Sequence, residues 1–321
     1  MRPATVLELA QELKVPLPAE DVDRLQAYLQ ADERTPSLVE YIEYFQLPIA
    51  VMQTAPALER TTYELCLDLA KDNVRYCEIR FGPWLHVQRG LSLAEVMRAV
   101  LQGWAAGQKK TGLTGGIIVT ALRDMPPAQN LALAQVAGRF AGEGVIGFDL
   151  AGDEAGHPPG LHQDAFRLAH SFGLNLTVHA GEAAGPESVR QAISLGAMRL
   201  GHGVRAQEDP EVLAMVKDEG IQLDTAPTSN AHTKAVRNYQ DHPLRRFFES
   251  GIKVTISTDS RTVSDITLTE EFSKVSRLLG CTREQIFAMN LQALDGGFGE
   301  PAARAKLRLE FVASDAALQK T

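Results

Sequence analysis

The chain has 321 residues, of which 45% are hydrophobic and 22% are charged, and its formal net charge is −8. This composition is typical of a globular protein with a large core, and the length allows one large α/β barrel or two ordinary domains. The acidic charge argues against nucleic acid or an anionic membrane as the main partner, because both require a basic surface. The sequence has no apolar run long enough to span a bilayer, its first eight residues lack the apolar region of a signal peptide, and its cysteines are too few for a disulfide framework. We expect a cytoplasmic protein with reduced thiols.

The first 72 residues have mainly helical patterns, over residues 5–13, 21–29, 38–45 and 61–72. Ser37 is the expected N-cap of the third helix. In that helix Leu38, Tyr41, Ile42 and Phe45 recur at i, i+3, i+4 and i+7 and form one apolar face. Such a face most often belongs to the core. The alternative is a lid over a flat apolar ligand.

From residue 74 onward, strand patterns alternate with helix patterns, which predicts a parallel sheet with helices outside. The expected helices cover residues 92–108, 128–141, 163–171, 186–195, 210–218 and 243–249, and further helices follow from about residue 268, with a break near Gly296. Seven strands are expected, near Val74, Gly116, Val145, Leu174, Met198, Ile221 and Ile252.

A closed barrel of this type has eight strands, so the first strand is missing from the count. An open doubly wound sheet would gather its polar residues near one switch point. Here polar residues follow several strands, which favours a barrel, and the absence of a linker predicts one domain over residues 1–321. Glu78 and Arg80 are charges inside a strand pattern, and we favour structural ion pairing in the barrel interior over catalysis for both.

Four ionisable residues are expected at the C-terminal ends of the strands: His179, Glu182, His202 and Asp259. Burying four such groups together is costly without a functional reason. His179 and Asp259 are credible ligands of a divalent metal. A hydrolytic metal site requires a water of lowered pKa with an acid and a base beside it. Glu182 is placed to give a proton, and His202 to hold or deprotonate the water.

Several segments resemble the adenosine deaminase family in their order and spacing: residues 178–182 (VHAGE), 200–203 (LGHG), 227–230 (PTSN) and 255–259 (TISTD). Residues 76–83 and 149–154 look like two further family segments, so the resemblance covers nearly the whole chain. It implies a TIM-type (β/α)8 barrel with one zinc ion at the C-terminal mouth. It also implies hydrolysis of the 6-amino group of a purine to a 6-oxo group, with release of ammonia.

The resemblance also implies roles for single residues. His179 and Asp259 would be zinc ligands, and Glu182 would protonate N1 of the purine. His202 would orient the zinc-bound hydroxide and stabilise its charge. The backbone N–H of Gly152 would bond to N3, where glycine permits a close approach. The nucleoside would be covered by the apolar face of the third helix, formed by Leu38, Tyr41, Ile42 and Phe45.

The sequence departs from the family pattern in its metal ligands and at Ser260. The family's other two ligands form a His-x-His pair at the end of the first barrel strand, and no such pair occurs here. We expect that the natural gene product starts upstream and that Met1 is an internal methionine of the turn after that strand. Two ligands are not expected to hold zinc tightly. Ser260 replaces a frequent second aspartate that bonds to N7, and its hydroxyl can donate the same bond.

The leading interpretation is a zinc-dependent deaminase of adenosine or a close 6-aminopurine nucleoside, with that small molecule as partner. The first alternative is the same chemistry on adenine or aminodeoxyfutalosine. The second is a catalytically inactive purine-binding barrel, which the absent ligands support and the retained Glu182 and His202 oppose. A cytidine-deaminase-type zinc site is excluded because the chain has no Cys-x-x-Cys.

Overall fold

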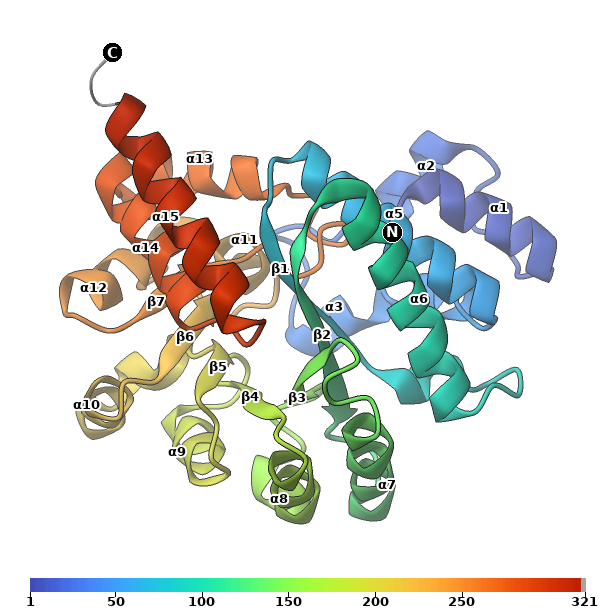
Figure 1. Ribbon diagram of the computed structural model, residues 1–321, viewed down its shortest axis with the longest axis horizontal. Helices are drawn as coiled ribbons and strands as arrows, with labels where there is room; N and C mark the ends of the chain where they lie inside the picture. Colours follow the sequence, from blue (N-terminus) through green and yellow to red (C-terminus); the bar gives the residue numbers. More distant parts are fainter. Residues whose placement is uncertain (319–321) are drawn as a thin grey trace.

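A curled parallel sheet of seven strands lies at the centre of the structure, a computed structural model that describes residues 1–318 (Figure 1). The strands follow one another in chain order, and each pairs in parallel with the next. This confirms the predicted α/β class and the seven strands. They are β1 (Tyr76–Phe81), β2 (Thr114–Leu122), β3 (Val145–Ala151), β4 (Asn175–Ala180), β5 (Arg199–His202), β6 (Gln222–Thr225) and β7 (Val254–Ile256).

The two outer strands of this sheet, β1 and β7, each have one strand neighbour, and within residues 1–318 they are not paired with each other. The barrel is therefore open between β1 and β7. Six of the helices that connect successive strands surround the sheet (Figure 1). They are α6 (Leu93–Thr111), α7 (Pro127–Gly138), α8 (Gln163–Ser171), α9 (Pro186–Ser194), α10 (Pro210–Asp218) and α12 (Leu244–Glu249).

Short helices supplement these elements, and one of them carries part of the site. The sequence patterns did not predict α11 (Pro227–His232), which follows β6 directly. Four 3₁₀ turns complete the connections: η1 (Pro83–His86), η2 (Pro159–His162), η3 (Val204–Glu208) and η4 (Tyr239–Asp241).

The helices before the sheet form a layer that lies partly beside it and partly across it (Figure 1). Ser37 caps α3 as predicted, accepting a bond from the N–H of Val39 at 3.2 Å. The helix expected over residues 38–45 ends two residues early, at Glu43, and a second helix begins at Gln46, because Pro48 has no N–H for the carbonyl of Tyr44 and its ring obstructs that carbonyl. The elements of this layer are α1 (Pro3–Leu13), α2 (Val22–Tyr28), α3 (Leu38–Glu43), α4 (Gln46–Val51) and α5 (Ala55–Lys71).

Helix α5 begins six residues before the predicted start, because Thr54 caps it and Pro56 is compatible with the first turn of a helix. It packs against α6 at two glycines. A Cβ atom on Gly103 would lie 2.3 Å from the carbonyl oxygen of Glu59, and one on Gly107 would lie 2.5 Å from Sγ of Cys66. These two glycines therefore permit the close approach of the two helices.

We expect Gly103→Ala to lower the free energy of unfolding by about 1–3 kcal/mol, the usual cost of overpacking a core. The added methyl group meets a backbone carbonyl, which cannot rotate away, and this outweighs the better helix propensity of alanine. Urea denaturation measures the change. Gln102→Ala, an exposed site on the same helix, is the matched control and should leave the midpoint almost unchanged. An unchanged midpoint for Gly103→Ala would contradict the close approach.

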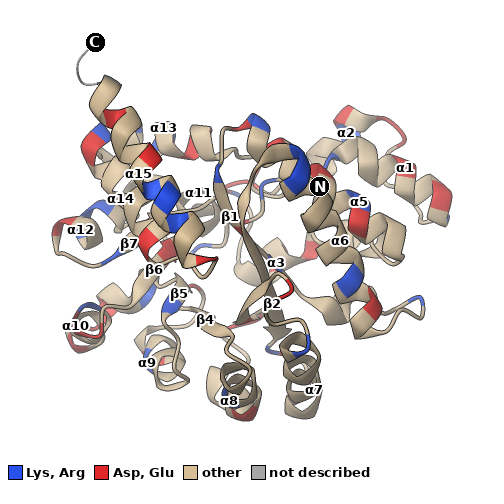
Figure 2. Ribbon diagram, viewed as in Figure 1, with Lys and Arg blue, Asp and Glu red and all other residues tan. Residues whose placement is uncertain are grey.

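Three helices complete the part of the chain that the structure describes: α13 (Leu268–Leu279), α14 (Arg283–Asp295) and α15 (Pro301–Leu318). The predicted break near Gly296 is confirmed, since it separates α14 from α15. Figure 2 shows acidic and basic positions interspersed on outer helices such as α10 and α15. Within residues 1–318, no helix is both long and apolar enough to cross a membrane.

Candidate active site

Adjacent strands place His179 and His202 side by side at the C-terminal end of the sheet. Strands β4 and β5 pair so that His179 lies opposite Gly201 and Ala180 opposite His202. The two imidazole rings are 5.2 Å apart between centroids. A Cβ atom on Gly201 would lie 3.1 Å from the His179 ring, so glycine leaves room for this imidazole.

Two of the predicted site residues have backbone conformations that side chains seldom adopt. His202 has φ of 67° and Asp259 has φ of 52°, both in the left-handed region. Such conformations cost free energy and concentrate at functional sites, where the surrounding fold enforces them. Two of the six non-glycine residues with positive φ within residues 1–318 therefore stand at strand ends where the sequence predicted chemistry.

Glu182 and His202 form a buried pair. Nε2 of His202 lies 3.3 Å from Oε2 of Glu182, and their side chains are 4% and 6% exposed respectively. The hydroxyl of Thr233 donates to Oε1 of Glu182 at 2.9 Å. Burial raises the pKa of the Glu182 carboxyl above its usual range, although the adjacent His202 opposes the shift. A carboxyl of raised pKa beside an imidazole is suited to acid–base chemistry near neutral pH.

The buried Glu154 carboxylate fixes the loop that carries Glu182. It accepts hydrogen bonds from four successive backbone N–H groups, those of residues 181–184, at 2.6–2.9 Å. The hydroxyl of Ser188 adds a fifth bond at 2.5 Å. Gly181, in this loop, has φ of 71°, which glycine adopts without penalty. The position of Glu182 is thus set by an anion inserted into its loop.

We expect Glu154→Gln to lower the free energy of unfolding by about 2 kcal/mol, because the amide NH2 faces N–H groups that then lack an acceptor. It should also release the Glu182 loop, so hydrogen exchange of the amide groups in residues 181–184 should accelerate. Thermal unfolding and exchange mass spectrometry measure both effects. Glu143→Gln, at an exposed position, is the matched control. Unaltered exchange in residues 181–184 would contradict the role of Glu154.

His179 is oriented by Asp149, a fully buried residue of β3. Nδ1 of His179 lies 3.1 Å from Oδ1 of Asp149 and 3.0 Å from Oδ2. Burial alone would raise the pKa of Asp149, but His179 and Arg80 together lower it to about 2. Burial opposes protonation of His179, and the Asp149 carboxylate outweighs this and raises its pKa. Metal-binding imidazoles are commonly held in this way through the nitrogen that does not face the metal.

The second implied ligand, Asp259, lies in the loop after β7. Its Oδ2 accepts a hydrogen bond from the hydroxyl of Ser229 at 2.7 Å. Across residues 1–318, no group of three or more His, Cys, Asp and Glu side chains is arranged to hold a metal ion. Catalytic zinc sites use three protein ligands. His179 and Asp259 have suitable donor chemistry, but the described residues do not form a complete zinc site.

Helix α3 covers this end of the sheet, and Tyr41 is its closest link to the site. Leu38 and Tyr41 are buried against Val263, and Phe45 is partly buried in the same cluster. Ile42 is 37% exposed, so the four residues of the predicted face do not share one environment.

The phenolic oxygen of Tyr41 lies 2.7 Å from Oγ of Ser264, and burial, with Asp259 nearby, raises the pKa of this phenol. This hydrogen bond, together with the packing of Leu38 and Tyr41 on Val263, joins α3 to the segment after β7. This segment follows Asp259 in the chain. The helix is therefore attached to the loop that carries the second implied ligand.

The remaining implied substrate contacts lie at the ends of β3 and β7. Gly152 directly follows β3 and has φ of 107°, a conformation that only glycine adopts freely. Ser260 is partly buried, and its Oγ accepts a bond from the N–H of Val263 at 3.5 Å. Both residues are at the strand ends that the sequence indicated, and their contacts with substrate remain predictions.

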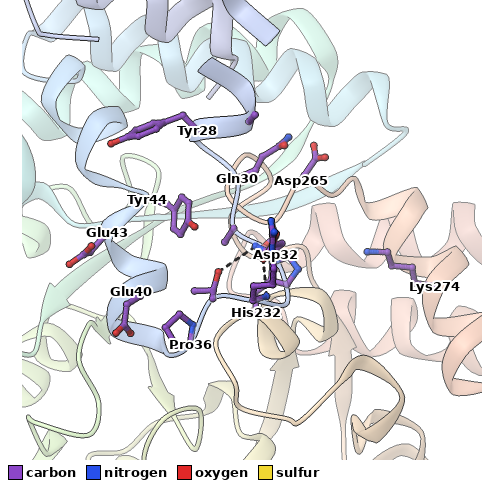
Figure 3. A pocket seen from close by; sticks show the side chains of 15 residues that line it. Tyr28, Gln30, Asp32, Pro36, Glu40, Glu43, Tyr44, His232, Asp265 and Lys274 are labelled. Atoms are coloured by element: carbon purple, nitrogen blue, oxygen red, sulfur yellow. Dashed lines mark hydrogen bonds and ion pairs between the residues drawn. The ribbon is translucent and has the colours of Figure 1, made fainter. Parts of the chain in front are cut away.

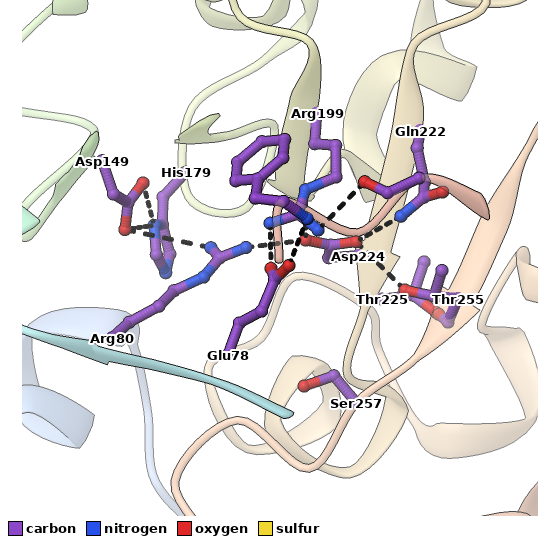
Figure 4. Close-up of polar contacts among 12 residues, drawn as sticks. Glu78, Arg80, Asp149, His179, Arg199, Gln222, Asp224, Thr225, Thr255 and Ser257 are labelled. Atoms are coloured by element: carbon purple, nitrogen blue, oxygen red, sulfur yellow. Dashed lines mark hydrogen bonds and ion pairs between the residues drawn. The ribbon is translucent and has the colours of Figure 1, made fainter. Parts of the chain in front are cut away.

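Charged side chains from four strands form ion pairs in the interior of the curled sheet, beside His179 (Figure 4). Arg80 contacts Asp224 at 2.6 Å and Asp149 at 3.8 Å. Arg199 contacts Glu78 at 2.5 Å and Asp224 at 3.5 Å. Glu78 and Arg80 thus pair with residues of other strands, in agreement with interior ion pairing. The network connects β1 with β3, β5 and β6.

A cavity of about 1050 Å³ lies beside α3 (Figure 3). Its lining includes Ser264, the hydrogen-bond partner of Tyr41, but neither Glu182 nor His202. It therefore lies beside the acid–imidazole pair rather than around it. Other lining residues come from α2, α3, α11, α13 and the α2–α3 loop: Tyr28, Asp32, Thr35, Glu40, His232 and Lys274.

Sequence reasoning missed five residues that support the site. Asp149 is a charge in an otherwise apolar strand, which is a signal for a paired buried carboxylate. Glu154 and Asn230 lie inside quoted motifs but had been given no role. Thr233 and His242 follow α11, and no local pattern marked them; Thr233 reaches Glu182 over 51 residues, and His242 acts through Asn230.

The family model and the most similar relatives in sequence agree on one family. The family model described as adenosine deaminase matches residues 1–313. An adenosine deaminase of Vibrio vulnificus (strain CMCP6) is 39% identical over 311 residues, which are 96% of this chain and 93% of that protein.

Two solved structures show the same fold. An adenine deaminase from Arthrobacter aurescens has a TM-score of 0.89 at 24% identity, covering 98% of this chain and 95% of its own. An amidohydrolase from Burkhoderia ambifaria, with bound Zn, has a TM-score of 0.89 at 23% identity, covering 100% and 88% respectively. The match of the family model to almost the whole chain, together with the 39% identical relative, shows that the chain belongs to the adenosine deaminase family of hydrolytic deaminases.

Proposed function

We propose that the chain hydrolyses the 6-amino group of adenosine, or of a closely related 6-aminopurine nucleoside, and releases ammonia. The observation that carries this proposal is the buried pair of Glu182 and His202, 3.3 Å apart at the end of the sheet. Replacement of an amino group on a purine ring by water requires a proton on the ring and a directed water molecule. The raised pKa of Glu182 suits the first requirement, and the imidazole of His202 suits the second.

In this proposal Glu182 donates its proton to N1 of the purine, which makes C6 electrophilic. His202 orients the attacking water and stabilises charge that develops on its oxygen. The N–H of Gly152 bonds to N3, and the hydroxyl of Ser260 bonds to N7. The base is covered by α3 through its apolar residues Leu38, Tyr41, Ile42 and Phe45.

We infer that His179 and Asp259 contribute to a zinc site of low affinity. Support comes from the two donor side chains and from the Asp149 carboxylate, which contacts Nδ1 of His179 and so leaves Nε2 for a metal ion. When bound, zinc would supply Lewis-acid activation of water. Two protein ligands are fewer than catalytic zinc sites use, so we expect the chain to lose zinc on dialysis against a weak chelator. Elemental analysis before and after dialysis measures this, and zinc that stays stoichiometric would mean that further residues complete the site.

The proposed reaction is tested by ammonia release from adenosine, with zinc added and withheld. Adenine and aminodeoxyfutalosine, the alternative substrates, are assayed beside it. Release from adenosine at the highest kcat/KM supports the proposal, and preference for either alternative reassigns the substrate. Binding of adenosine without any release of ammonia, at saturating zinc, would instead support an inactive purine-binding barrel. The two-ligand arrangement is the observation that favours this second candidate.

A further inference from the structure

A chain of hydrogen bonds leads away from His202 to the start of α12. Nδ1 of His202 lies 2.9 Å from Nδ2 of Asn230, and Oδ1 of Asn230 lies 3.0 Å from Nε2 of His242. Nδ1 of His242 accepts a bond from the backbone N–H of Leu244 at 3.1 Å. His202, Asn230 and His242 are all buried, with exposures of 3%, 0% and 5%.

The direction of every bond in this chain follows from its last member. A backbone N–H is always a donor, so Nδ1 of His242 must accept, and the proton of the neutral ring is on Nε2. Burial lowers the pKa of His242 to about 3, which keeps the ring neutral. Nε2–H then donates to Oδ1 of Asn230, which directs the NH2 group of Asn230 toward His202. Nδ1 of His202 therefore accepts, and its ring proton is on Nε2, the atom that faces Glu182.

We propose that Asn230 and His242 are positioning residues that hold His202 in its Nε2–H tautomer, so that His202 presents a proton donor to the reacting centre. This inference rests on the proposed role of His202 and deepens it. A ring with its proton on Nε2 stabilises negative charge on the attacking oxygen and cannot act as a base through that atom. While no substrate is bound, this N–H faces Oε2 of Glu182, which can accept a hydrogen bond from it.

Asn230→Asp is the sharpest test, because it changes one NH2 group to an oxygen and little else. A carboxylate at this place accepts, so it should draw a proton onto Nδ1 of His202. Ring-nitrogen NMR of protein labelled with ¹⁵N-histidine reads the tautomer directly and requires no catalytic activity. The His202 signal is assigned from its loss in His202→Asn.

We expect the unaltered protein to show a protonated Nε2 and a bare Nδ1 for His202. In Asn230→Asp, Nδ1 of His202 should be protonated. The kcat for ammonia release should then fall at least ~10²-fold, with KM little changed. In serine proteases, a substitution that imposes the wrong histidine tautomer lowers kcat about 10⁴-fold. His242→Phe should have a smaller effect, about tenfold, because Asn230 then loses only its orienting partner. Asn290→Asp, on α14, makes the same change outside this chain of bonds and should leave the His202 signals and kcat unaltered.

A protonated Nδ1 on His202 in the unaltered protein would overturn the proposal, whether or not any variant folds. So would an Asn230→Asp protein that folds and keeps the original tautomer, because Asn230 would then be merely structural. Failure of the proposed function has a different signature. The tautomer results would be as expected, while no variant and no unaltered protein would release ammonia.

Discussion

Glu182→Gln is expected to reduce kcat for ammonia release at least ~10²-fold at saturating zinc, with little change in KM, because the amide cannot donate the proton that general-acid catalysis requires. The amide keeps the size of the side chain and can still contact Thr233, so substrate binding should persist. Steady-state assays on adenosine measure both constants. Glu187→Gln, an exposed site in the following helix, is the matched control and should behave as the unaltered protein.

The same substitution has a second, opposite effect on stability. The pKa of Glu182 is raised in the folded protein, so its ionisation destabilises the fold as pH rises above the unfolded value of about 4.3. Glutamine does not ionise, so the Glu182→Gln variant does not lose stability in this way as pH rises. In metal-free protein, Glu182→Gln should therefore gain stability relative to the unaltered chain between about pH 4 and the folded pKa of Glu182. Near-normal turnover would remove Glu182 from the acid role, and a stability difference independent of pH would contradict its raised pKa.

The sequence predicted most of the fold because hydrophobic alternation marks each strand and each helix locally. Helices α8 and α10 end where the pattern ends. The errors have identifiable physical causes: Pro48 ends the helix expected after Ser37 two residues early, and Pro56 is compatible with the early start of α5. The helix α11 was missed because its segment has six residues and is mostly polar although it is buried, so it has no apolar face to give a period.

The site was predictable only in part. His179, Glu182, His202 and Asp259 stand at strand ends, where the topology of a parallel barrel brings side chains together. The residues that support them are determined by tertiary contacts instead. Glu154 reaches its partners 27–34 residues away, and Asn230 reaches His202 over 28 residues. No pattern within one segment contains this information.

Arg199→Met is expected to lower the free energy of unfolding by about 3–5 kcal/mol, the usual cost of removing one partner from a buried ion pair. The Arg199 side chain is 5% exposed, contacts Glu78 and Asp224, and lies 3.6 Å from the ring centroid of Phe298. Methionine fills much of the same space and leaves two buried carboxylates without this cation. Urea denaturation at several pH values measures the loss.

The pH dependence of this loss identifies its electrostatic origin. In the unaltered protein, burial would raise the pKa of Asp224, but Arg199 and Arg80 outweigh this effect and lower that pKa. The paired carboxylate therefore stabilises the fold above pH ~4, and this contribution is lost as pH falls below that value. Without Arg199 the folded pKa of Asp224 rises, so the deficit of Arg199→Met should be largest near pH 7 and narrow toward pH 4. The double variant Arg199→Met/Glu78→Gln should lose less stability than the two single variants lose together. Arg199→Met leaves the Glu78 carboxylate unpaired, and Glu78→Gln removes that carboxylate. The loss of unfolding free energy could instead be constant with pH and additive between the two substitutions. Arg199 would then act through packing on Phe298 rather than through the ion pairs that connect β1 to the rest of the sheet.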